Sequence, residues 1–113
     1  MPLTAGRRDE TNERFKNTLQ KLVSLTFVPQ HFPAIDAELE KLGLSLEKLA
    51  EIDSDELLED IGKQNMDFEN AELFADFLSR GFPALAVAVY RYIQQNNKVY
   101  SFGIADKITA LAS

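Results

Sequence analysis

The chain has 113 residues, a net charge of −6 and no cysteine, and 45% of its residues are hydrophobic. These values predict a single core of ordinary domain size and exclude disulfides, catalytic thiols and thiolate metal ligands. An acidic chain without a basic block lacks the clustered cations that bind phosphate backbones, so we expect no nucleic-acid partner and no membrane partner. Neither a leader nor a membrane span is recognisable, because the longest apolar run, Phe82 to Tyr90, is far shorter than the roughly 20 residues a span requires. We expect a cytoplasmic protein.

Apolar residues recur every three or four positions, and no segment alternates in the way of a strand. This periodicity predicts an all-α fold. Residues 1–8, which contain a proline and a glycine, are expected to form a flexible arm before a single helical domain over residues 9–113. The first helix is predicted over Asp9–Phe27, with a stop at Val28 because the residue before a proline resists helical angles.

Short helices are predicted in the middle of the chain. Pro33 stands at the start of the second helix, where its missing N–H costs nothing. Gly43 is expected to end that helix in a left-handed conformation. Ser45 caps the third helix and Asp53 the fourth, which Gly62 ends.

Three further helices complete the prediction. Asp67 caps a fifth helix of about Phe68 to Arg80, which ends at Gly81. The sixth helix, about Pro83 to Asn96, is apolar almost all round in its first half. It is therefore expected to be buried on several sides by its own chain or to be covered by a partner protein. Ser101 caps the last helix. The expected architecture is a compact array of six to seven short helices in hairpins.

One pattern repeats at an interval of fifty residues. The sequence Phe-Pro-Ala followed by an aliphatic residue occurs at 32–35 and again at 82–85, and Phe27 and Phe77 match at the same interval. The simpler interpretation is a common way of starting a helix after a loop. The alternative is duplication of a helical hairpin.

The fifth and sixth predicted helices carry a spaced set of residues. Leu73 and Phe77 are large and apolar, Ala86 is small, and Tyr90 is aromatic. This pattern, over residues of about 70–98, resembles a single tetratricopeptide-type hairpin, with departures at Asn70, Phe74, Ile93 and Lys98. The resemblance implies a right-handed helical-hairpin scaffold for the C-terminal half, of the kind that contacts other proteins, and it implies no activity.

Catalytic and metal-binding patterns are missing from the sequence. His31 is the only histidine, which excludes histidine metal sites and Cys–His pairs. The acidic segment 53–60 lacks the ligand spacing of a calcium loop and is interpreted as a solvated helix face. The glycine-rich phosphate loops and the serine elbow are also absent. We therefore expect no enzyme, no cofactor and no metal site.

The function that remains is a non-catalytic protein–protein interaction or scaffold module. One alternative is a homodimer joined through the sixth helix, and another is a small-ligand-binding protein or enzyme built from residues distant in sequence. Tyr90 and Tyr92 point about 200° apart on a helix, so one is expected in the core and the other at the surface. The candidate interface residues are Val87, Val89, Tyr90, Arg91 and Tyr92.

Overall fold

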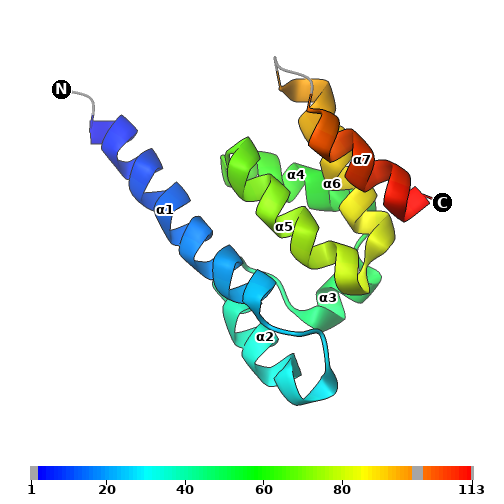
Figure 1. Ribbon diagram of the computed structural model, residues 1–113. Coiled ribbons are helices and arrows are strands. Elements are labelled where there is room, and N and C mark those ends of the chain that lie inside the picture. Colours follow the sequence, from blue (N-terminus) through cyan, green and yellow to red (C-terminus); the bar gives the residue numbers. More distant parts are fainter. Residues whose placement is uncertain (1–2, 98–100, 113) are drawn as a thin grey trace.

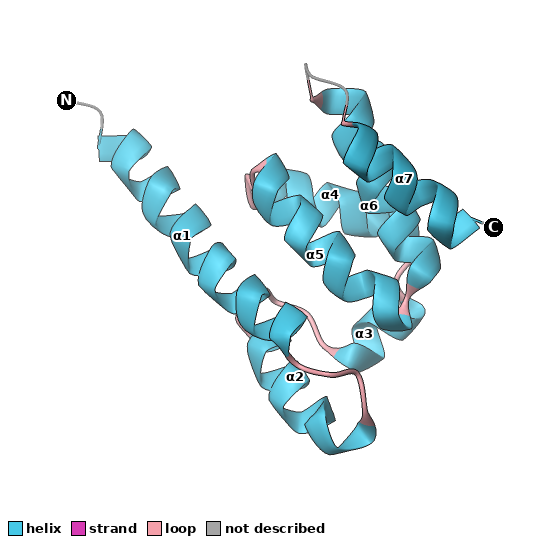
Figure 2. Cartoon of the chain, viewed as in Figure 1, coloured by secondary structure: helices cyan, strands magenta, loops and turns pink. Residues whose placement is uncertain are grey.

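The computed structural model describes residues 3–97 and 101–112, and the side chains of residues 11–97 and 101–111. The described part contains helices and loops and no strand (Figure 1, Figure 2), which confirms the predicted all-α class. The elements in chain order are α1 (Leu3–Ser24), the 3-10 turn η1 (Pro29–His31), α2 (Phe32–Glu40), α3 (Leu46–Glu51), α4 (Ser54–Lys63), α5 (Phe68–Gly81), α6 (Pro83–Asn96) and α7 (Phe102–Ala112). None of these helices is long and apolar enough to cross a membrane.

The hairpin of α5 and α6 lies at the centre of the packing. Helix α1 packs on α5, whereas α4 and α7 pack on α6, and α2 packs on α1. Helix α1 is the longest and runs along one edge of the molecule, with α2 beneath its C-terminal end (Figure 1). The chain therefore has a closed C-terminal half and a more open N-terminal pair.

Helix α6 is buried by its own chain. Its side chains pack against α5 on one side and α4 and α7 on others, as expected for a helix that is apolar over most of its surface. The nearly all-apolar sequence is therefore explained without a partner. Its buried residues are Leu85, Ala86, Val89, Tyr90 and Ile93.

The predicted helix caps are confirmed. Ser45, Asp67 and Ser101 accept hydrogen bonds from the backbone N–H three residues on, at 3.0, 2.8 and 3.2 Å. Asp53 accepts from the N–H of Asp55 at 3.1 Å. Gly43 has a φ of 75°, the left-handed conformation expected after a helix. These caps could be predicted from the sequence because each involves residues that are close together in the chain.

Three predicted boundaries are wrong. Helix α1 begins at Leu3, within the segment predicted to be an arm, since a single glycine at position 6 costs only about 1 kcal/mol among good helix formers. The same helix ends at Ser24 rather than Phe27. Helix α4 continues past Gly62 to Lys63, and Asn65 takes the positive φ of 55° that turns the chain.

Phe27 leaves the helix because it belongs to an aromatic cluster. Its ring centroid lies 5.1 Å from that of Phe32, 6.0 Å from Phe82 and 6.3 Å from Phe77. Such tilted and edge-on pairs are favourable beyond the area they bury. These four rings are the aromatic residues of the fifty-residue repeat, so the repeat brings its matching positions together at one point of the fold.

Gly81 is the close-approach position in this cluster. A Cβ atom built there would lie 2.5 Å from the Cζ atom of Phe27, whereas one built at Gly62 would meet nothing within 4 Å. Both glycines are helical, so the gain in helix propensity from alanine is the same at each. Only at position 81 does the added methyl displace an aromatic ring.

We expect Gly81→Ala to lower the free energy of unfolding by about 1–2 kcal/mol through overpacking, and Gly62→Ala to raise it by about 1 kcal/mol. Urea unfolding of both variants measures the difference. Adding Phe27→Leu to Gly81→Ala should recover part of the loss, because the smaller side chain frees the space. Equal effects of alanine at the two glycines would contradict the close contact.

Candidate functional site

The predicted interface on α6 lies mostly inside the molecule. Val89 is 0% exposed and Tyr90 2% exposed, so neither reaches the surface, and that part of the prediction is wrong. Val87 and Tyr92 are half-buried, and only Arg91 is exposed. The expected division between the tyrosines is confirmed: Tyr90 is a core residue, whereas Tyr92 packs its ring 6.2 Å from Phe68 near the surface.

Tyr90 belongs to a polar cluster that joins three helices. Its hydroxyl donates a hydrogen bond to the Asp76 carboxylate of α5. Lys107 of α7 donates to Asp76 at 2.9 Å and to Glu72 at 2.8 Å, and its ammonium lies 5.7 Å from the Tyr90 ring centroid. The cluster therefore fastens α7 to the α5–α6 hairpin.

The electrostatics of this cluster favour the protonated states. Burial, the hydrogen bond to Asp76 and the nearby carboxylates raise the pKa of Tyr90 well above its ordinary value of 10.0. Burial lowers the pKa of Lys107, but its hydrogen bonds to Glu72 and Asp76 outweigh that effect, so the pKa is raised above 10.5. A phenol and an ammonium held protonated in this way serve as structural donors rather than as acid–base catalysts near neutral pH.

We expect stability to fall as the pH rises through 10. Below the ordinary pKa values of 10.0 and 10.5, folded and unfolded chains both hold these protons. Above them the unfolded chain releases protons that the folded chain retains, which favours unfolding. Urea unfolding at a series of pH values checks the slope.

Tyr90→Phe tests the assignment. The variant should lose about 1 kcal/mol at neutral pH with the hydrogen bond to Asp76, and its stability should fall less steeply above pH 10 than that of the original chain. Tyr92→Phe serves as the control for removing a phenol from the same helix. A Tyr90→Phe slope equal to that of the original chain would contradict the role of Tyr90.

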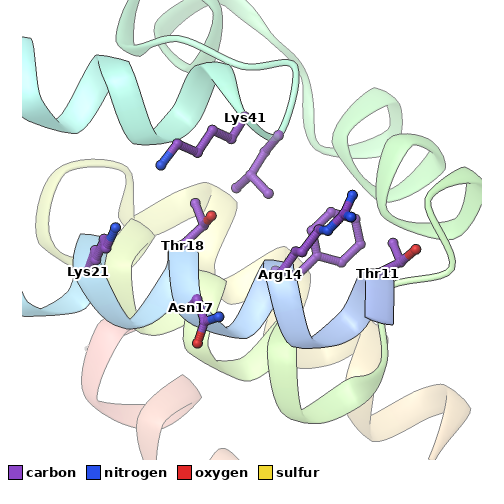
Figure 3. A pocket seen from close by; sticks show the side chains of 8 residues that line it. Thr11, Arg14, Asn17, Thr18, Lys21 and Lys41 are labelled. Atoms are coloured by element: carbon purple, nitrogen blue, oxygen red, sulfur yellow. The ribbon is translucent and has the colours of Figure 1, made fainter. Parts of the chain in front are cut away.

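A different feature offers space for a ligand. A cleft of about 430 Å³ lies between α1 and the segment that ends α2 (Figure 3). Figure 3 shows Thr18 pointing from α1 towards the segment that carries Lys41. The cleft is lined by Thr11, Arg14, Phe15, Asn17, Thr18, Lys21, Lys41 and Leu42.

The floor and the rim of this cleft differ in character. Leu42 and Thr18 are 4% and 7% exposed and form the floor, with the half-buried ring of Phe15 beside them. The exposed side chains of Arg14, Lys21 and Lys41 form the rim. Most of the lining comes from one face of α1, since residues three, four and seven apart share a helix face.

The rim carries an excess of positive charge. Glu38 receives two hydrogen bonds from Lys41, at 2.9 and 3.2 Å, and its carboxylate lies 3.9 Å from the Lys21 ammonium. Arg14 has no ion pair or hydrogen bond within the described residues. A single carboxylate does not neutralise three cations, so the cleft is a basic region on an acidic protein.

Hydrogen bonds hold α1 in the position that forms the cleft. The Asn12 carboxamide accepts from the N–H of Asp67 at 3.0 Å, and the buried Asn70 amide donates to the Asn12 carbonyl at 2.8 Å. At the other end, Arg80 donates to the Leu25 carbonyl at 3.0 Å. The wall of the cleft is therefore fixed to α5 at both ends.

The chain matches no protein-family model, no curated protein and no solved structure. The resemblance of residues 70–98 to a tetratricopeptide-type hairpin therefore stays a prediction.

The remaining candidate groups have local roles. The Nδ1 atom of His31 lies 2.8 Å from the Thr26 carbonyl, which only accepts, so this nitrogen donates and the ring ties the loop before α2. In the acidic segment 53–60, Asp53 caps α4 and Asp60 lies 4.0 Å from Lys48. Among the described side chains no three carboxylate or histidine groups are placed to hold a metal ion.

Sequence reasoning missed the basic cleft. Arg14 and Lys21 are seven residues apart, which places them on one helix face, so two of the three rim cations could be predicted from the sequence to lie together. Lys41 and Leu42 reach the same site only through the fold of α2 back along α1. The net charge of −6 is a sum over the whole chain and does not reveal this local excess of cations.

Proposed function

We propose that the chain is a non-catalytic protein-binding module that receives a segment of a partner protein in the cleft between α1 and α2. The observation that carries this proposal is the form of the cleft: a hollow of about 430 Å³ with a floor of Leu42, Phe15 and the buried Thr18, and a charged rim. Interfaces that bind peptide segments combine these two elements, an apolar anchor position and surrounding polar contacts.

The arrangement of the helices supports this proposal. The closed C-terminal half has most of its apolar residues covered by its own helices, although Phe102 of α7 is 79% exposed, and its polar cluster is satisfied by internal hydrogen bonds. The cleft instead presents the exposed, unpaired Arg14 beside the half-buried Phe15. A homodimer through α6 has less support, because Val89 and Tyr90 are buried within the chain.

The test fills the cleft and leaves its charge unchanged. Asn17 and Gln20 are exposed amides on α1, but only Asn17 lines the cleft. Asn17→Trp adds a large ring at the border of the cleft, and Gln20→Trp adds the same ring at a position that does not line it. Displayed random peptides are selected on the original chain, and the affinity of the selected peptides is then measured for both variants.

Asn17→Trp is expected to weaken the selected peptides by about tenfold or more, about 1.4 kcal/mol, and Gln20→Trp to leave their affinity unchanged. Circular dichroism and urea unfolding confirm that both variants fold. Failure to select any peptide, or equal binding to the two tryptophan variants, would refute the cleft as a protein-binding site.

A further inference from the structure

We infer that the segment bound in the α1–α2 cleft is acidic, with two carboxylates spaced about 10 Å apart on either side of an apolar residue. This inference rests on the proposed function and adds the chemistry of the occupant. It follows from the charge, the spacing and the surroundings of the rim cations.

The charge of the rim selects for carboxylates. Arg14 is exposed and has no partner among the described residues, so its guanidinium is free to take a carboxylate through two parallel hydrogen bonds. Lys21 and Lys41 share the carboxylate of Glu38 and retain positive charge between them. A neutral or basic segment would leave these cations without compensation.

The spacing of the rim selects for a segment rather than a small anion. Arg14 and Lys21 are seven residues apart on α1, which separates their backbones by about 10 Å along the helix axis at 1.5 Å per residue. One phosphate or carboxylate contacts both cations only if the two long side chains converge on it, whereas two separate carboxylates pair with them as they stand. Two acidic side chains meet this distance when they are about three residues apart in an extended segment or about seven apart in a helix.

The floor supplies the position between the two carboxylates. Phe15 follows Arg14 on α1 and is half-buried, and Leu42 lies beside it at 4% exposure. An apolar side chain entering here would cover the exposed part of the Phe15 ring. The expected pattern is therefore acidic, then apolar, then acidic.

The rest of the surface disfavours a long polyanion such as a nucleic acid. Asp55, Glu56 and Glu59 are exposed on α4, and the whole chain carries a charge of −6. A short segment interacts mainly with the charges within about 8–10 Å of it at physiological salt. It therefore experiences the basic cleft, whereas a long polyanion also meets the acidic surface.

The experiment reverses one rim charge and one matched charge elsewhere. Arg14 and Arg91 are both exposed arginines without a described partner, on α1 and α6. Arg14→Glu and Arg91→Glu change the net charge equally, so they separate the local charge of the cleft from the overall charge. Arg14→Gln is the milder second variant, and circular dichroism confirms that each variant folds.

Peptides selected on the original chain are expected to carry the spaced acidic pattern. Their affinity for Arg14→Glu should be lower by a factor of about ten or more. Their affinity for Arg14→Gln should fall by an intermediate factor, and their affinity for Arg91→Glu should not change. Raising the salt concentration should weaken binding, as expected for contacts between exposed charges.

The failures of the two proposals are distinguishable. Suppose that Asn17→Trp weakens binding of the selected peptides. If these peptides are neutral or basic, or if Arg14→Glu does not weaken their binding, the occupant is not acidic, but the cleft is still a protein-binding site. A larger loss with Arg91→Glu than with Arg14→Glu overturns both and places binding on α6. Citrate and single-stranded DNA are titrated in parallel, and tighter binding of either than of the selected peptides overturns the peptide occupant.

Discussion

The packing of Phe27 is the interaction on which the N-terminal half of the fold depends. Its ring contacts Phe32 at the start of α2, Phe77 in α5 and Phe82 at the start of α6. Since Phe27 stands in the loop after α1, this one side chain fixes where the chain turns back and where α2 begins. The absence of a side chain at Gly81 gives the ring room to lie against α5. The position of α2, and with it the cleft, follows from this contact.

Burial and charge are divided between the two halves of the molecule. In the C-terminal half, Asp76 receives hydrogen bonds from Tyr90 and Lys107, so the charges at the contact of α5, α6 and α7 are compensated within the chain. At the α1–α2 cleft, Glu38 compensates two lysines only in part and Arg14 has no described partner. The uncompensated charge is the physical difference between a structural cluster and a surface available to a ligand.

The sequence predicted the helices better than it predicted their contacts. The caps Ser45, Asp67 and Ser101 were readable because a side chain and the backbone three residues away satisfy each other. The candidate interface failed at Val89 and Tyr90, because an apolar helix has the same sequence whether its own chain or a partner covers it. The cleft could not be predicted because it forms only where Lys41 lies beside α1, and that position depends on how the loop between α1 and α2 folds.

The two helix pairs share the fifty-residue repeat but differ in the length of the connection between their helices. Both α2 and α6 begin at a Phe-Pro pair, at positions 32 and 82. Between α5 and α6 the connection is Phe82 alone, so the two helices pack closely along their lengths. Between α1 and α2 the connection is longer: residues 25–31, which include η1, precede the Phe-Pro pair that starts α2. This longer connection lets α2 contact α1 over a smaller surface, and the space left beside Phe15 and Leu42 is the cleft. The closed and the open helix pair thus begin their second helices in the same way and differ in the length of the connection and of the helix that follows it.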